Sequence, residues 1–177
     1  SGCTLSSAAR DLIGTLPDLK HLSLNQCAID SINAFVGLTK LESLDIANNT
    51  ISDLTALSSM TQLQELNISN NPITTITYLN NCLALKTLSM ESCGVSKLSA
   101  LAGNTSLEEL YAANNEIEDI SVLSDCTALR VIDVSSNQVS DISLLPGLPE
   151  LVNFKANNNK ITAIPKFDAE TSKLVQF

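Results

Sequence analysis

The sequence predicts an α/β repeat solenoid, curved and right-handed, with a parallel β-sheet on the concave face and short 3-10 segments on the convex face. Two observations predict this fold. Apolar residues recur at a 22-residue spacing, and seven consecutive units fit that spacing without a gap. The units begin at Leu19, Leu41, Leu63, Leu85, Leu107, Leu129 and Leu151. One unit cannot bury its own apolar face, so stacked units must share a continuous core.

The first part of each unit predicts a short strand. In the unit that starts at Leu41, Leu44 and Ile46 alternate with Ser43 and Asp45, which is the pattern of a strand with one buried face. The apolar residues that follow are spaced by about three, which is too tight for a strand and typical of 3-10 turns. These residues are Ile51, Leu54, Leu57 and Met60. One unit has Asn104 at its last apolar position, and we expect this side chain to pack less well or to lie at the edge of the convex layer.

A polar column follows the strands. The ninth residue of each unit is Asn or Cys, and a buried Asn can donate and accept hydrogen bonds where the chain turns away from the sheet. A thiol is a weaker donor, so we expect the two turns that carry Cys to be held less firmly. The predicted structural ladder consists of Cys27, Asn49, Asn71, Cys93, Asn115, Asn137 and Asn159.

The same spacing divides the chain. Residues 1–18 break the pattern and predict a helical N-terminal cap or part of an earlier repeat, with Thr4, Ser6 or Ser7 as the N-cap. Residues 19–172 hold the seven repeats, and residues 173–177 resemble the start of a further, truncated repeat. An apolar edge remains at that end, so we expect more chain or another molecule to cover it.

Composition excludes several functions. Nineteen acidic residues against ten basic residues give a net charge of −9, which disfavours nucleic acid and anionic membranes and favours a neutral or basic protein ligand. No apolar run is long enough to insert into a membrane. The chain has one His and no nucleophile motif, glycine-rich phosphate loop or metal-ligand spacing, so we expect neither an enzyme nor a bound cofactor or metal.

The five cysteines are read as free thiols. Cys27 and Cys93 fall in the ladder, while Cys82 and Cys126 share another inward position, and the differences in position and unit disfavour pairing among these four. Cys3 is expected in a loose terminus. Without a CxxC spacing, zinc has no support. Free buried thiols are compatible with a reducing cytosol or with a bacterial exterior.

The repeats, with segments such as ISDLTAL, IEDISVL and VSDISLL, resemble the 22-residue class of leucine-rich repeats and, within it, the internalins of Gram-positive bacteria. Internalin-like proteins are secreted or wall-anchored, and several grip a host surface protein with the concave strand face. The resemblance therefore implies a protein-protein interaction module, the ligand-binding or adhesion region of an extracellular or bacterial cell-surface protein. Cysteines in the Asn column and the shortage of concave aromatic residues depart from that pattern.

Two alternatives stay open at this level. An intracellular, cytoplasmic leucine-rich repeat scaffold that regulates a partner protein would explain unpaired cysteines. A structural spacer would explain a plain concave face. In each case we expect a monomer.

The candidate partner-binding patch is centred on Tyr111, the only aromatic residue at the outward concave positions of the repeats. Those positions are the third, fifth and seventh of each unit, and they include Ala47, Ser69 and Ala113. Tyr is enriched at binding hot spots because it offers a large rigid surface with a polar tip. Strands about 4.8 Å apart would surround it with an acidic rim. The predicted patch comprises Tyr111, Glu109, Asp133, Glu91, Ser89, Glu65 and Val131.

Overall fold

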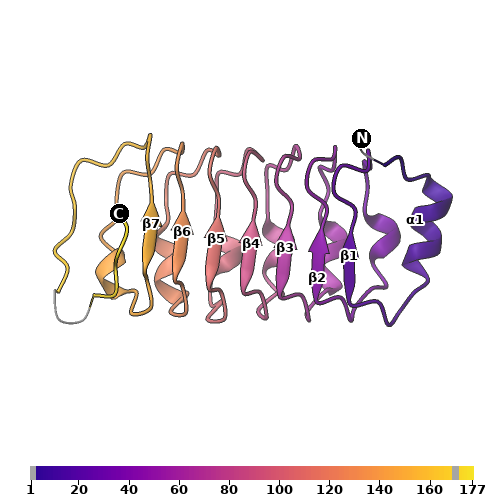
Figure 1. Cartoon of the computed structure of the whole chain (residues 1–177), viewed down its shortest axis with the longest axis horizontal. Coiled ribbons are helices and arrows are strands. Elements are labelled where there is room, and N and C mark those ends of the chain that lie inside the picture. The colour runs from indigo at the N-terminus through magenta and orange to yellow at the C-terminus, as the bar shows by residue number, and fades with distance from the viewer. Residues whose placement is uncertain (1–2, 169–171) are drawn as a thin grey trace.

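The computed structural model describes residues 3–168 and 172–177. One α-helix comes first, and strands then alternate with 3-10 helices along the chain (Figure 1). The elements are α1 (Ser7–Gly14), β1 (His21–Ser23), η1 (Asn33–Phe35), β2 (Ser43–Asp45), η2 (Thr55–Ser59), β3 (Glu65–Asn67), η3 (Thr77–Leu79), β4 (Thr87–Ser89), η4 (Ser99–Leu101), β5 (Glu109–Tyr111), η5 (Ser121–Asp125), β6 (Val131–Asp133), η6 (Leu145–Gly147) and β7 (Asn153–Lys155).

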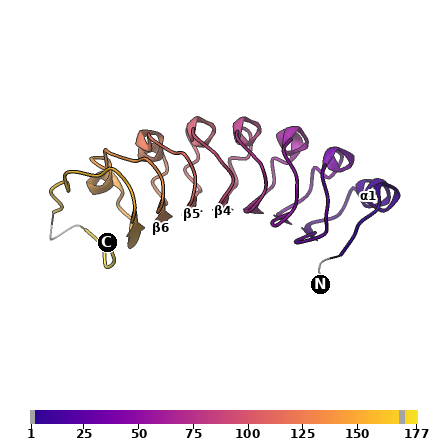
Figure 2. The ribbon, with the colours of Figure 1, turned by 90° about the horizontal axis from the view of Figure 1, so that it is seen from above.

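Within the described residues, the seven strands form one parallel sheet in the order β1 to β7. Each strand residue lies opposite the residue 22 positions later, as Leu44 does with Leu66. Figure 2 shows the sheet on the inner side of an arc and the 3-10 helices on the outer side. The predicted solenoid, with its parallel concave sheet and convex 3-10 segments, is confirmed.

The core runs the length of the stack. The apolar residues of the unit that starts at Leu41 are at most 1 % exposed, and equivalent residues of neighbouring units join them in one hydrophobic cluster. They are Leu41, Leu44, Ile46, Ile51, Leu54, Leu57 and Met60. Each unit therefore buries its apolar residues against the next, and packing between repeats supplies the stability that one unit lacks.

Amide side chains join successive units at the turn after each strand. The Asn137 Nδ2 group donates to the carbonyl oxygens of Ala112, one repeat earlier, and Val134, both at 2.9 Å. The Asn137 Oδ1 atom accepts from the backbone N–H of Ile117 at 3.0 Å. One side chain thus satisfies backbone groups of two repeats that the strands leave unpaired. Equivalent bonds are made by Asn49, Asn71, Asn115 and Asn159.

The residue before each ladder position adopts a left-handed backbone conformation. Asn48, Asn70, Asn114 and Asn158 have φ between 56° and 58°. Asn tolerates this region better than most residues other than Gly, because its short side chain bonds locally. The Asn-Asn pairs of the sequence therefore serve two purposes, the first residue for the turn and the second for the ladder.

Cys93 serves the ladder only in part. Its Sγ atom donates to the carbonyl of Ile68 at 3.4 Å, but a thiol has no oxygen to receive the N–H of Ile73. That N–H bonds instead to the backbone carbonyl of Asn71 at 2.8 Å. The turn is closed locally, with one fewer bond between repeats.

The N-terminal segment closes the first repeat covalently. Cys3 and Cys27 form a disulfide, so the prediction that Cys27 is a free thiol and Cys3 part of a loose terminus is wrong. The Leu5 N–H also donates to the Cys27 carbonyl at 3.2 Å. Among the described residues, helix α1 and not a repeat precedes this turn, and a covalent bond holds the turn. The expectation that the Cys27 turn is weakly held is likewise wrong.

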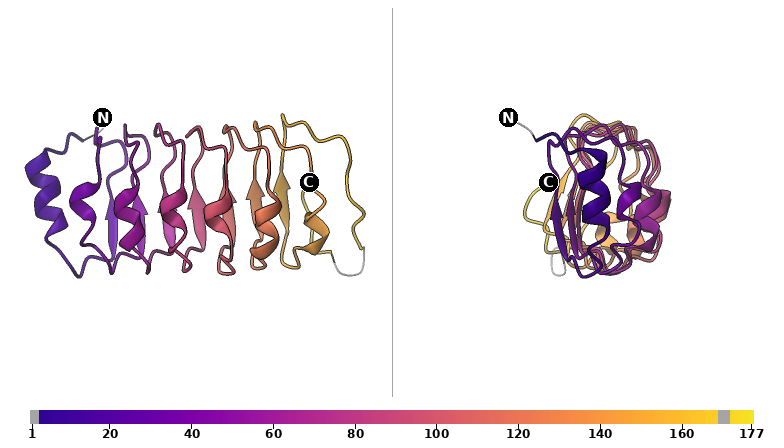
Figure 3. Two further views of the ribbon diagram at one scale, coloured as in Figure 1. Left: turned by 180° about the vertical axis from the view of Figure 1, so that it is seen from behind. Right: turned by 90° about the vertical axis from the view of Figure 1, so that its right-hand side faces the viewer.

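Helix α1 covers the end of the stack (Figure 3). Ser6 is its N-cap and accepts the Ala9 N–H at 3.2 Å. At the other end, Gly14 lies so close to η1 that a Cβ atom there would stand 2.0 Å from the Ala34 carbonyl oxygen. Only Gly permits this contact between α1 and the first repeat.

The other cysteines are free and buried, as the sequence predicts for Cys82, Cys93 and Cys126. Burial raises the pKa of Cys82 to about 11 and that of Cys126 to about 11. Asn104 lies between the two in the same column and is 2 % exposed. The expectation that Asn104 packs poorly or lies at an edge is wrong, because its Nδ2 donates to the Cys82 carbonyl at 3.3 Å and its Oδ1 accepts the Ser106 N–H.

The last residues extend the sheet by one bridge. Gln176 pairs with Asn153 in parallel, one position later than the 22-residue register of the other strands. The Phe177 ring packs at a tilt against the Phe154 ring, with centroids 5.6 Å apart. Phe177 is nevertheless 56 % exposed and Val175 is 84 % exposed, so this end of the core is thinly covered.

We expect Asn137→Ala to lower the free energy of unfolding by about 1 to 3 kcal/mol, because it leaves buried backbone groups of two repeats without partners. Urea unfolding followed by circular dichroism measures the loss. Ser140→Ala, at an exposed position of the same repeat, is the matched control and should change stability by less than about 0.5 kcal/mol. Equal effects at the two positions would contradict the role of the ladder.

We expect Cys3→Ser to lower the free energy of unfolding by about 2 to 4 kcal/mol, since the disulfide closes a loop of 24 residues. The same urea experiment measures it. Reductant should produce a similar loss in the wild-type protein and none in the variant. An unfolding curve unaffected by both changes would show that the disulfide contributes nothing to folding.

Candidate functional site

The concave face presents two outward rows of side chains, set by the register of the sheet. One row runs through Glu65, Thr87, Glu109 and Val131, and the other runs through Asn67, Ser89, Tyr111, Asp133 and Lys155. Neighbours within a row are separated by one strand spacing, about 4.8 Å. Function on this face therefore depends on combinations of residues from different repeats.

Tyr111 is half-buried and lies between Ser89 and Asp133 in its row. Its hydroxyl donates to Glu109 Oε2 at 3.1 Å. Burial raises the pKa of Tyr111, and the hydrogen bond to Glu109 and the negative charges of Glu109, Asp133 and Glu91 raise that pKa further. The Tyr111 hydroxyl is thus fixed by Glu109, and three carboxylates surround the side chain.

Other residues of the predicted patch have different neighbours. Val131 lies opposite Glu109, beside the Tyr111 group. Glu65 is separated from Glu109 by Thr87, so it does not join that group. Its Oε2 instead accepts from the Ser43 hydroxyl at 3.0 Å. The predicted patch therefore divides into two parts. One is the Tyr111 cluster, which consists of Tyr111, Ser89, Glu91, Glu109, Val131 and Asp133, and the other is the separate acidic residue Glu65 on β3.

The third outward position is not a surface position in every repeat. Ala47, Ser69 and Ala113 are 2 %, 5 % and 7 % exposed, so their predicted exposure is wrong. The chain turns directly after these positions, because the next residue of each repeat has a left-handed backbone conformation. Glu91 falls in the same column and stays half-buried, with its N–H bonded to the Ser69 hydroxyl at 3.0 Å.

Sequence reasoning missed Lys155 as a partner of Asp133. Lys155 Nζ lies 3.8 Å from Asp133 Oδ2, and the other carboxylate oxygen accepts the Ser135 N–H at 3.0 Å. Asp45 and Asn67 accept in the same way from the N–H two residues later. This recurring acidic or amide residue two positions before the turn is the signal that could have revealed a structural role for Asp133.

A shallow hollow of about 260 Å³ lies on the sheet beside the Tyr111 cluster. It is lined by Ser43, Leu44, Asp45, Glu65, Leu66, Asn67, Thr87 and Ser89. Two of these residues, Glu65 and Ser89, belong to the predicted patch. The hollow is open and polar at its rim, which suits a partner side chain better than an enclosed small molecule.

The described part of the chain holds neither a group of metal-binding side chains nor a membrane-spanning helix. Among residues 3–168 and 172–177, no three His, Cys, Asp or Glu side chains are grouped so that they could hold a metal ion. No helix in that part is both long and apolar enough to cross a lipid bilayer.

Comparison with protein families finds leucine-rich repeats along most of the chain. A family described as leucine-rich repeats in two copies matches residues 61–103 and 105–147, and a second leucine-rich repeat family matches residues 1–51 and 17–73. A search of curated protein sequences finds no match.

Solved structures similar to this chain include two internalins from Listeria monocytogenes. The internalin inlF is 27 % identical with a TM-score of 0.84, and the match covers 99 % of this chain and 57 % of that one. Internalin C2 is 27 % identical with a TM-score of 0.77, covering 97 % and 73 %. A leucine-rich repeat protein from Leptospira interrogans shares the fold, at 22 % identity and a TM-score of 0.86 over 94 % of this chain and 44 % of that one. The chain thus spans just over half the length of inlF.

We expect Tyr111 to ionise above the ordinary pKa of about 10. The chain has two tyrosines, so in Tyr78→Phe an absorbance titration at 295 nm follows Tyr111 alone. Folding favours the neutral hydroxyl of Tyr111. Its contribution to stability is therefore complete below about pH 10, and it is lost as the pH rises through the pKa of Tyr111 in the folded state. Adding Glu109→Gln should lower the midpoint, because it removes a negative charge and weakens the hydrogen bond. A titration midpoint at or below pH 10 that Glu109→Gln leaves unchanged would contradict the described geometry.

Proposed function

Because the chain belongs to the leucine-rich repeat family, we propose that it is a protein-protein interaction module that binds its ligand on the concave face. The observation that carries the proposal is the likeness to two internalins at 27 % identity over nearly the full chain. Repeat domains of this kind are typically non-catalytic. Their framework residues are fixed by stacking, and the outward strand residues remain free to suit a partner.

The proposed setting is outside the cell, as the ligand-binding or adhesion region of a secreted or surface-attached bacterial protein. The Cys3–Cys27 disulfide supports this setting, since such bonds persist in oxidising compartments and are rare in the cytosol. It also weakens the main argument for an intracellular scaffold, which rested on unpaired cysteines, although Cys82, Cys93 and Cys126 remain free. A host surface protein is the proposed class of ligand, and a monomer is the proposed state.

The Tyr111 cluster is the proposed centre of the contact. Tyr111 combines a large rigid ring with a fixed polar tip, the qualities that make Tyr a frequent hot-spot residue. Ser89 is its neighbour on β4 and Val131 is the neighbour of Glu109 on β6, and neither side chain is large. Anchors of this kind cost about 2 kcal/mol or more when truncated.

A binding screen against arrayed extracellular domains of host surface proteins tests this function. We expect at least one domain to bind the wild-type chain, with Tyr111→Ala weakening that affinity about thirtyfold or more. Ser121→Ala, on the convex η5 and exposed, is the matched control and should bind like the wild type. Failure to bind any arrayed domain would favour the structural spacer, and equal binding by both variants would show that Tyr111 is not the centre of the contact.

A further inference from the structure

The charges of the concave face are unevenly matched. In the described part of the chain, its strands and the residues just after them carry five carboxylates but only one Lys, the residue Lys155. The carboxylates are Asp45, Glu65, Glu91, Glu109 and Asp133. Lys155 forms an ion pair with Asp133, with 3.8 Å between Lys155 Nζ and Asp133 Oδ2. The face therefore keeps a net negative charge over β2 to β6.

The remaining concave acids have only neutral donors among the described residues. Asp45 accepts from the Asn25 side chain and the Ala47 N–H, both at 3.1 Å. Glu65 and Glu109 each accept from one hydroxyl group. These hydrogen bonds position the carboxylates without compensating their charge.

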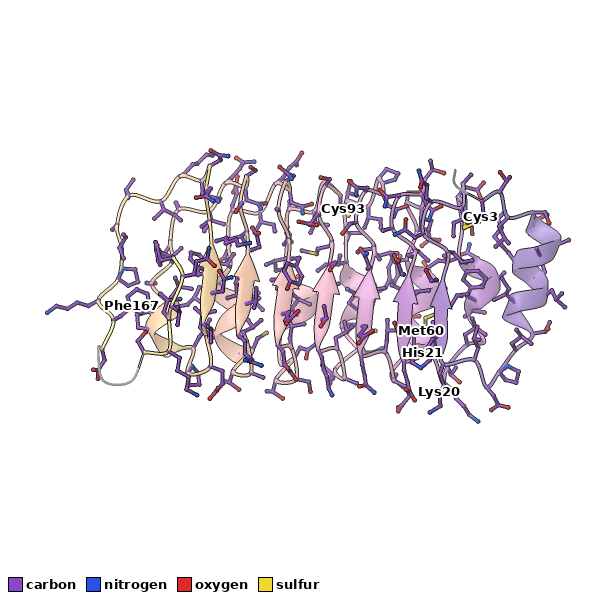
Figure 4. The ribbon with its side chains drawn as sticks, in the orientation of Figure 1. Cys3, Lys20, His21, Met60, Cys93 and Phe167 are labelled. Carbon is purple, nitrogen blue, oxygen red and sulfur yellow. A yellow bond between two sulfur atoms is a disulfide. The ribbon has the colours of Figure 1, made fainter. Side chains whose placement is uncertain are left out.

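Elsewhere the chain places cations beside its acids. Lys20 pairs with Glu42 at 2.7 Å, at the lower edge of the sheet in Figure 4, where Lys20 is labelled. Three further ion pairs are Arg10 with Asp30, Lys40 with Asp18 and Lys173 with Glu150, and none involves a strand residue. These four pairs thus place basic residues beside acids outside the strands, and Lys155 is the one cation that an ion pair joins to a strand carboxylate among the described residues.

Aromatic and acidic groups coincide at Tyr111. A Lys or Arg side chain laid on the Tyr111 ring would meet the negative face of the ring and the carboxylates of Glu109, Glu91 and Asp133 together. The hollow around Glu65 lies about two strand spacings away, about 10 Å, which is the reach of three residues of extended chain. Two cationic side chains three residues apart could occupy both places.

We propose that the concave face binds an extended, basic segment of its protein partner, with Arg or Lys side chains over Tyr111 and in the hollow beside Glu65. The inference rests on the proposed function and names the chemistry of the ligand. The negative charge of the concave face favours a basic ligand, because opposite charges attract across an interface. The Tyr111 ring provides a fixed point of contact for that ligand.

A peptide titration tests the inference. The probe is a nine-residue peptide in which Arg occupies every third position and Gly the others, and the matched peptide carries citrulline in place of Arg. Amide shifts of the isotope-labelled chain report the contact residues and the dissociation constant. We expect the Arg peptide to shift amides of β3 to β6, and the neutral citrulline peptide to bind at least about tenfold more weakly.

Paired variants separate a concave site from attraction to an acidic protein in general. The triple variant Glu65→Gln, Glu91→Gln, Glu109→Gln should raise the dissociation constant about tenfold or more. The control Glu116→Gln, Glu118→Gln, Asp125→Asn removes the same three charges at exposed positions outside the strands, and should raise it less than about threefold. Glu109→Gln alone should give an intermediate loss, which provides a milder variant if the triple one is unstable.

Two results would overturn the inference: equal weakening by the two triple variants, or equally tight binding of the citrulline peptide. The outcome is separate from that of the ectodomain screen. If a host domain binds more weakly to Tyr111→Ala but equally well to the acid-to-amide variants, the proposed function is supported and a basic ligand is ruled out. Arg-peptide binding on the concave face with no host domain bound would do the reverse.

Discussion

The hydrogen bonds from each ladder Asn to two consecutive repeats are the constraint on which the rest of the structure depends. A short strand followed by a sharp turn leaves backbone groups that neither the sheet nor the 3-10 helix can pair. The Asn137 side chain meets these groups in its own repeat and in the one before. Register along the sheet, the closely stacked core and the regular concave rows all follow from this repeated connection. At Cys27, which follows helix α1 and the first strand, a disulfide to Cys3 holds the turn.

Much of the fold follows from spacing alone, because strand alternation and three-residue steps have direct geometric meaning. The sequence could not reveal the partner of Cys27, since Cys3 lies outside the repeat and pairing depends on how the N-terminal segment returns across the first turn. Asn104 was misjudged because a buried amide is costly only without partners, and here it has two. Local periodicity predicts which side chains point inward. Whether an inward polar side chain finds hydrogen-bond partners depends on the neighbouring units.

The concave face was predictable as a set of positions but not as a surface. Counting by two places Tyr111, Glu109 and Asp133 outward, and the register brings them together. The same counting fails at Ala47 and Ala113, where the chain already bends into the turn. It also cannot show that Lys155 reaches Asp133 from the next repeat. The binding role of the Tyr111 patch stays a prediction, supported by its geometry and by the likeness to internalins.

Photo-crosslinking from the two faces of a single repeat tests the central claim that the concave sheet is the surface that meets a partner. A benzophenone side chain would be placed at Ser89 on β4 or at Ser99 on η4, and each protein applied to intact host cells. The account predicts a discrete cross-linked product from position 89 and none from position 99. A product from position 99 alone, or equal products from both, would contradict it.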